Sequence, residues 1–203
     1  MLSCNDEIVP VGSNKILIFG GYWQNEKTYK KDEIILYKDK DIEIITVGNI
    51  LSRALISKIS EDKIIIAGGT VGSIPYDKTQ EIEIYDTNTK KLDQIGVFTQ
   101  HRQTRTNYFP EYSGIKLSDR YFMTAGGNGA LGAFGYDLKS TDIIDLSEKT
   151  VTKGPSLVYQ STHFEMFKLK TGDVLCIFKG ISQEIPFRHK TQILRLNKRR
   201  IKL

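Results

Sequence analysis

The chain has 203 residues, with 29 Lys and Arg against 24 Asp and Glu, a formal net charge of +5 and a pI of about 9.0. This length suits one domain that buries its own core. Two cysteines, Cys4 and Cys176, exclude a disulfide framework and a four-cysteine zinc site. A content of 39% hydrophobic and 26% charged residues excludes a mostly disordered chain. No apolar run approaches the roughly 20 residues of a membrane-spanning helix, so we expect no membrane span.

The positive charge lies at one end of the sequence. Residues 190–203 contain six Lys or Arg and no acid, whereas residues 1–189 contain 23 basic and 24 acidic residues. No aromatic residues are interleaved with this basic tail, and charged residues at the margin of a last strand block edge pairing. We therefore expect no nucleic-acid partner.

An apolar segment that ends in glycine recurs four times along the chain. Its copies are KILIFGG at 15–21, KIIIAGG at 63–69, RYFMTAGG at 120–127 and the degenerate DVLCIFKG at 173–180. The second glycines are spaced by 48, 58 and 53 residues, a period of about 50. Such a period predicts a repeat architecture.

Each copy has the same neighbours in sequence. A first apolar strand and a short polar turn precede it, and a long polar loop, a third strand, a tight turn and a fourth strand follow it. No window has a sustained 3.6-residue apolar period, so we expect little helix. Near-continuous apolar runs such as Val174–Phe178 are typical of strands buried on both faces.

The sequence therefore predicts an all-β fold, a single β-propeller domain over 1–203 built from four four-stranded blades. The blades are expected at about 5–46, 51–96, 112–153 and 160–203. The first strands are expected at Glu7–Val11, Arg53–Ile59, Tyr112–Leu117 and His163–Leu169, the third at Glu33–Tyr37, Glu81–Tyr85, Thr141–Asp145 and Thr191–Leu196, and the fourth at Ile42–Thr46, Lys91–Ile95, Thr150–Thr152 and Arg199–Leu203.

The Gly-Gly strand end, the polar loop and a following strand that carries IYD resemble kelch repeats of the bacterial, galactose-oxidase-like type. Residues 53–96 form the best copy, and the resemblance covers nearly the whole chain. Arg53 occupies the arginine position that often precedes the inner strand of such repeats, and His163 resembles the histidine that often follows that arginine. The tryptophan common in the fourth strand is absent, and Trp23 lies after the first Gly-Gly instead.

The number of repeats departs from the kelch pattern, because kelch propellers usually have six or seven blades. Four blades imply a small closed ring, an open arc that needs a partner, or a piece of a longer protein. Large apolar faces are rarely left exposed, so we expect an open arc to self-associate.

Propeller geometry separates the connections between strands onto two faces. Turns between the first and second and between the third and fourth strands share one face, and here they are short. The other face receives the long segments 22–32, 70–80, 96–111, 128–140 and 181–189. Loops on a rigid scaffold often carry function. The candidate binding residues on and beside these loops are Tyr22, Trp23, Arg53, Tyr76, Arg102, Arg105, Asn128, Tyr136, His163 and Arg188.

Aromatic residues and arginine anchor protein interfaces, and aromatic residues with Asp and Asn also suit a sugar. We therefore expect a non-catalytic binding module that holds a protein segment or a glycan on the long-loop face. The structural alternative is that loop aromatics pack over the core, while Arg53 bonds a neighbouring blade and His163 faces the channel. The kelch resemblance also leaves open a carbohydrate-active propeller enzyme, either a sugar mutarotase or epimerase or an oxidase relative.

Catalytic signatures are sparse. The three histidines, His101, His163 and His189, are isolated, so we expect no metal and no cofactor. Cys176 lies within a buried strand, which predicts a core residue and not a nucleophile. The acids lie mostly in turns or on exposed strand positions, where no pair suits glycoside hydrolysis. No signal peptide is recognisable, and the sequence leaves the compartment open between cytoplasmic, as given, and cell-surface, if an N-terminal segment precedes it.

Overall fold

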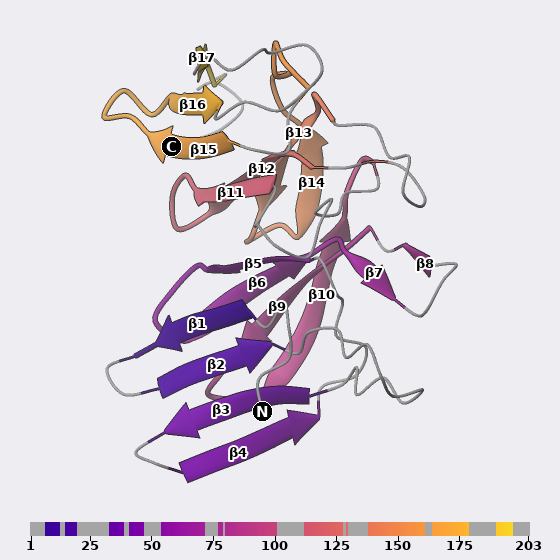
Figure 1. Cartoon of the computed structure of the whole chain (residues 1–203), viewed down its shortest axis with the longest axis vertical. Helices are drawn as coiled ribbons and strands as arrows, with labels where there is room; N and C mark the ends of the chain where they lie inside the picture. Colours follow the sequence, from indigo (N-terminus) through magenta and orange to yellow (C-terminus); the bar gives the residue numbers. More distant parts are fainter. Residues whose placement is uncertain are drawn as a thin grey trace.

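The computed structural model describes most of the chain from the second repeat onward and the strands of the first repeat. The described residues are 7–12, 15–19, 33–38, 41–46, 54–71, 77–78, 80–100, 112–127, 129, 138–160, 164–178 and 190–196. In them the chain is all β, with antiparallel sheets and no helix (Figure 1). In particular, these residues contain no helix that could cross a membrane.

Four sheets follow one another in chain order, and we number them one to four. Sheet one contains β1 (Glu7–Val11), β2 (Lys15–Phe19), β3 (Glu33–Lys38) and β4 (Asp41–Thr46). Sheet two contains β5 (Leu55–Lys58), β6 (Lys63–Ala67), β9 (Glu81–Asp86) and β10 (Lys91–Val97). Sheet three contains β11 (Tyr112–Lys116), β12 (Tyr121–Gly126), β13 (Thr141–Asp145) and β14 (Thr150–Lys153). Sheet four contains β15 (Phe164–Lys168), β16 (Val174–Phe178) and β17 (Lys190–Leu194).

The predicted strands are confirmed wherever the structure describes them, with ends that shift by one or two residues. The expected fourth strand of the last repeat, Arg199–Leu203, lies outside the described residues. One element was not predicted: β7 (Thr70–Val71) and β8 (Asp77–Lys78) form a two-stranded ladder inside the connection expected to be a loop.

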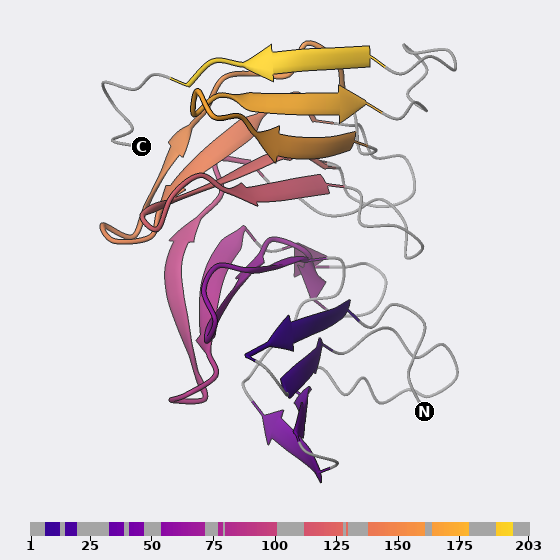
Figure 2. The same cartoon turned by 90° about the vertical axis from the view of Figure 1, so that its left-hand side faces the viewer.

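The sheets stack in an arc. The first strands β1, β5, β11 and β15 contact one another in that order along the arc. Sheets one and four lie at opposite ends of the molecule in both views (Figures 1 and 2), so the described strands do not close a ring.

Local structure repeats along with the strands. The turn from the first to the second strand is closed by the same backbone hydrogen bond in sheets two, three and four, with N–O distances of 2.8–2.9 Å. These bonds run from the amides of Ile59, Leu117 and Leu169 to the carbonyls of Lys63, Tyr121 and Asp173. The turn after β9 uses Asp86, whose Oδ1 accepts the amides of Asn88 at 2.9 Å and Thr89 at 3.0 Å, as the sequence of this turn predicts.

Apolar side chains fill each gap between neighbouring sheets. Between sheets one and two the core contains Leu17, Ile64 and Tyr85. Between sheets two and three it contains Ile65, Phe98 and Phe122, and between sheets three and four Met123, Phe164, Val174, Cys176 and Phe178. The central strands of sheets two and three are therefore covered on both faces, which explains why β12 is buried along its whole length.

Two glycines allow sheets two and three to approach closely. A Cβ at Gly114 on β11 would lie 2.6 Å from Leu55 Cδ2 and 2.7 Å from the Phe122 ring. A Cβ at Gly96 on β10 would lie 2.8 Å from Val151 Cγ2. Gly114 thus relieves crowding at the inner margin of this junction and Gly96 at the outer margin, where β10 packs on β14.

Candidate functional site

All ten sequence-predicted site residues lie outside the part of the chain that the structure describes. The structure therefore neither brings them together nor separates them, and their role stays a prediction. What it does describe is the scaffold from which their loops leave, together with a pocket and two buried carboxylates, Asp142 and Asp145.

The long connections of sheets two and three leave their strands in the same way. Gly68 and Gly69 have φ values of +65° and +98°, and Gly126 and Gly127 have values of +69° and +90°. Both pairs therefore use the left-handed region, which glycine adopts without a Cβ clash. The base of each connection has the same backbone hydrogen bond, from the Gly68 amide to the Glu81 carbonyl at 2.8 Å and from the Gly126 amide to the Ser140 carbonyl at 3.1 Å. Equivalent glycines thus start both loops at the same end of adjacent sheets, which we call the long-loop end.

A buried carboxylate lies near this end, at the junction of sheets two and three. Asp142 on β13 is fully buried, and its Oδ1 accepts a 2.6 Å hydrogen bond from Thr99 Oγ1. Thr124 pairs with Asp142 in the register of β12 and β13, and its buried hydroxyl has no hydrogen-bond partner in the described structure. Thr99 directly precedes the segment that carries Arg102 and Arg105. Asp142 therefore anchors the start of a connection on which the sequence places candidate ligand contacts.

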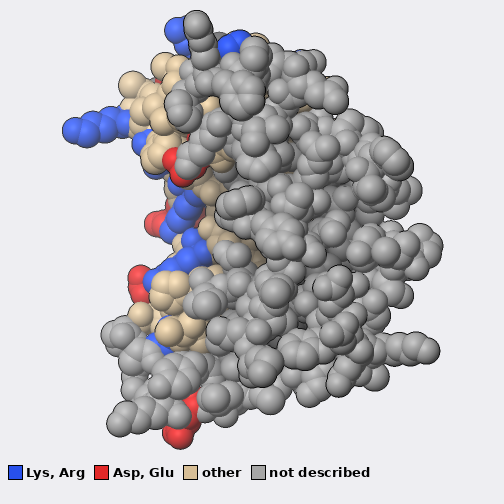
Figure 3. Space-filling view, viewed as in Figure 1, with Lys and Arg blue, Asp and Glu red and all other residues tan. Residues whose placement is uncertain are grey.

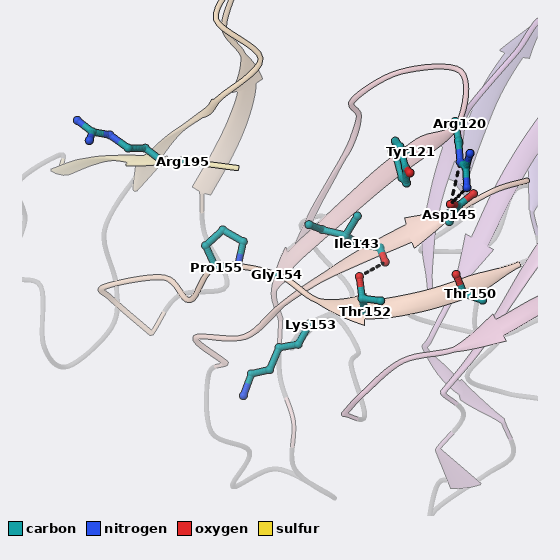
Figure 4. Close-up of a pocket in the computed structure, with 10 residues that line it drawn as sticks. All are labelled: Arg120, Tyr121, Ile143, Asp145, Thr150, Thr152, Lys153, Gly154, Pro155 and Arg195. Carbon is teal, nitrogen blue, oxygen red and sulfur yellow. Dashed lines mark hydrogen bonds and ion pairs between the residues drawn. The ribbon is translucent and has the colours of Figure 1, made fainter. Parts of the chain in front are cut away.

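The described pocket lies elsewhere, along the outer part of sheet three where it faces sheet four (Figure 4). Its volume is about 450 Å³. Its walls come from the turn before β12, from β12, β13 and β14, from the segment that leaves β14, and from one residue that follows β17. They consist of Arg120, Tyr121, Ile143, Asp145, Thr150, Thr152, Lys153, Gly154, Pro155 and Arg195.

Arg120 and Asp145 dominate the chemistry of this pocket. Arg120 donates from Nε to Asp145 Oδ2 at 2.8 Å, and its Nη2 lies 2.7 Å from the same oxygen. The other carboxylate oxygen, Oδ1, accepts the backbone amides of Ser147 and Glu148 at 3.0 Å each. Both oxygens of Asp145 are therefore engaged within the fold.

The pKa of Asp145 follows from these contacts. Burial disfavours the carboxylate and would raise its pKa, but the hydrogen bonds from Arg120, Glu148 and Ser147 outweigh burial and lower it. Asp145 thus stays ionised as the anchor of the β13–β14 turn and is unsuited to act as a proton acceptor. Asp86 occupies the corresponding place in sheet two, where Lys63 Nζ lies 3.9 Å from its Oδ2.

The remaining cations of the pocket do not converge on this pair. The side chains of Lys153 and Arg195 extend away from Arg120 and Asp145 (Figure 4). Thr152 Oγ1 donates to the Ile143 carbonyl at 3.5 Å, so this hydroxyl also faces the sheet. The pocket therefore holds structural polar groups and no set of side chains aimed at one point.

Other titratable groups of the described chain have structural surroundings. Cys176 is fully buried in the core between sheets three and four, and burial raises its pKa to about 12, which confirms the predicted core residue. Burial, with the nearby Glu81 charge, raises the pKa of Glu83 on β9 to about 7. The described residues contain no group of three His, Cys, Asp or Glu side chains that could hold a metal ion.

Charges of both signs alternate at the short-turn end of the strands, on the left edge of the molecule as drawn (Figure 3). Two of the pairs occupy equivalent positions: Lys58 Nζ lies 2.8 Å from Glu61 Oε2, and Lys116 Nζ lies 2.7 Å from Asp119 Oδ1. Exposed pairs of this kind contribute little stability, and they present no surface of a single sign.

Sequence reasoning missed Asp142 and the Arg120–Asp145 pair. The signal for Asp145 was present, because an acid ends the third strand in both EIEIYD and TDIID. The signal for Asp142 was its position inside the predicted strand Thr141–Asp145, next to the apolar residues Ile143 and Ile144. Burial of that acid depends on a residue 43 positions away, Thr99, which no local pattern indicates.

Comparisons with known proteins yield no relative: neither a protein-family model nor a curated protein sequence matches the chain. The class that the fold defines is an all-β protein of repeated antiparallel sheets.

Proposed function

We propose that the chain is a non-catalytic binding module of the kelch-propeller kind, and that it holds a protein segment or a glycan at the long-loop end. The observation that carries the proposal is the equivalence of the loop bases in sheets two and three. The connections after Gly68–Gly69 and Gly126–Gly127 start with the same backbone geometry. The long connections of adjacent sheets therefore start at the same end of a rigid scaffold.

The contrast between the two ends of the strands supports this assignment. At the short-turn end the connections are tight, and their polar groups are bonded within each turn. Asp86 accepts the amide of Asn88, and Asp145 accepts the amide of Ser147. The connections that start at the long-loop end contain Tyr76, Arg102 and Tyr136 in the sequence. Aromatic and arginine side chains anchor protein interfaces, and aromatic rings also stack on the apolar faces of sugars.

The arc of described strands favours a partial propeller over a small closed ring. Four sheets in sequence order, stacked through their first strands, correspond to four consecutive blades. Such an arc presents its loops along one rim, where an extended ligand would contact several repeats at once.

The experiment is a binding screen with the purified chain on a glycan array and in co-purification from an extract of the source cells. We expect a ligand that binds the chain and is lost from the double variant Arg102→Ala with Arg105→Ala, and from Tyr76→Ala with Tyr136→Ala. Lys170→Ala is the matched control, because Lys170 is exposed on a tight turn at the opposite end.

The proposal would be refuted if neither screen yields a ligand, or if a ligand binds the loop variants as tightly as the wild type. A ligand lost equally from Lys170→Ala would place the site at the short-turn end and would also contradict it. If the chain converts a bound sugar into a product, the proposal of a non-catalytic module is wrong. The carbohydrate-active enzyme that the kelch resemblance leaves open would then be the correct interpretation.

A further inference from the structure

The two end sheets carry apolar positions that the inner sheets bury. The second residue of the KILIFGG-type segment is Ile16 in sheet one and Ile64 in sheet two, and the turn bonds align these with Phe122 and Val174. Ile64, Phe122 and Val174 are each 0% exposed, because each packs against the preceding sheet. Ile16 has no preceding sheet among the described strands and is 37% exposed.

Sheet four shows the converse on its other face. The strand registers pair Met123 with Ile143 in sheet three and Leu175 with Ile193 in sheet four. Ile143 is buried at 6% exposure by sheet four, whereas Ile193 is 55% exposed. Phe167, opposite Leu175 on β15, is 45% exposed. Phe167, Leu175 and Ile193 thus form an apolar row across three strands.

These two faces are the two halves of the junction that the chain already makes three times. The end face of sheet four has the residue types that sheets two and three use to cover the next sheet. The end face of sheet one has, at Ile16, the residue type that sheets two to four insert into the preceding sheet. The neighbouring row on sheet four, Glu165–Ile177–Thr191, is polar at both margins, as the rim of an interface is.

We propose that a second copy of this chain completes the junction, with the end face of its sheet one packed on the end face of sheet four. One chain does not satisfy both faces itself, because they lie at opposite ends of the arc (Figure 2). The contact is heterologous, and two such contacts between two chains close a ring of eight sheets. Eight is within the range of four to eight blades typical of propellers.

Sedimentation velocity and light scattering over a concentration series test this arrangement. The wild-type chain is expected to approach twice its 23.1 kDa mass and to stop there. Ile193→Asp and Ile16→Asp each place a charge in every junction and should raise the dimer dissociation constant more than about tenfold. Val97→Asp is the matched control, since Val97 is a 50% exposed strand residue on β10, away from both end faces, and it should dimerise like the wild type. Far-UV circular dichroism checks that each variant is folded.

Mixing the two variants distinguishes a heterologous contact from a symmetric one. In the mixture, sheet four of the Ile16→Asp chain and sheet one of the Ile193→Asp chain are both intact, so one junction forms. A dimer should therefore return that neither variant forms alone.

Three results would overturn the proposal. They are a wild-type chain that stays monomeric at its highest soluble concentration, a dimer that Ile16→Asp leaves unchanged, and a mass that grows without limit as in an open filament. None of these depends on which ligand the long-loop end binds, so failure here and failure of the proposed function are separable.

Discussion

The junction between sheets two and three is closed across its full width, whereas the junction between sheets three and four is closed only on its inner side. In the first, Gly114 and Gly96 let the inner and outer strands of the two sheets come into contact. In the second, Phe178 meets the rings of Phe164 and Tyr159, each at a 5.4 Å centroid distance, but a pocket of about 450 Å³ remains along β14.

This difference shows that the burial of a sheet face depends on how far the neighbouring sheet extends across it. β14 contacts β10 on one face, and on its other face it lines the pocket with Thr150 and Thr152. The end faces of sheets one and four are the limiting case, because no described sheet covers them. The same apolar pattern is thus fully buried in the inner sheets and only about half-buried on the two end faces.

The largest expected effect comes from breaking the junction between sheets three and four. Phe178→Ala removes a ring that is fully buried against two aromatic neighbours and should lower the free energy of unfolding by about 3–5 kcal/mol. Phe167→Ala is the matched control on the exposed end face of the same sheet, and it should cost less than about 1 kcal/mol. Urea unfolding of dilute protein measures both, and equal losses would contradict the comparison.

Overpacking tests the closed junction between sheets two and three. Gly114→Ala forces a methyl group into Leu55 and Phe122 and should cost about 1–3 kcal/mol. Adding Leu55→Val removes part of the clash, so the double variant should lose less than the sum of the two single losses. Strict additivity in thermal or urea unfolding would mean that the two sheets do not meet at this point.

The two turn acids compare sheets two and three directly. Asp145→Ala breaks a partly buried ion pair and two amide hydrogen bonds and should cost about 2 kcal/mol, against about 1 kcal/mol for Asp86→Ala, whose cation lies 3.9 Å away. The pKa of each acid is lowered in the fold. Their stabilisation is therefore present above about pH 4 and is lost as the pH falls below it. Variant and wild type should converge in acid, and a gap that persists there would contradict this account.

Glu83 gives an effect of the opposite sign. Its pKa is raised from 4.5 to about 7, so between these values the folded state keeps a proton that the unfolded state has released. Stability due to this residue therefore falls as the pH rises from 4.5 to 7. Glu83→Gln should be close to neutral at pH 4 and should stabilise the fold by about 1–2 kcal/mol at pH 8. A stabilisation that is the same at both pH values would show that the ionised carboxylate is not the cause.

Much of the fold follows from the sequence because its signals are local. The Gly-Gly strand ends and polar turns place the strands to within a residue or two, as Thr141–Asp145 illustrates. The β7–β8 ladder escaped prediction because two-residue strands carry no periodicity. Asp142 escaped because its burial requires contact between two sheets. The predicted binding residues, Arg53 and Tyr136 among them, belong to segments outside the described structure, so their arrangement stays a prediction.

Site-directed cross-linking tests most directly whether the two end faces are halves of one junction. The chain would carry Ile16→Cys and Ile193→Cys with Cys4→Ser, while the buried thiol of Cys176, whose pKa is raised to about 12, remains unreactive. A short bismaleimide should join two chains into a covalent dimer, through a peptide pair that contains positions 16 and 193. The control with Ile16→Cys and Val97→Cys should form no covalent dimer, although its chains still associate. A folded protein that forms no dimer, or that links only 193 to 193, would contradict the account.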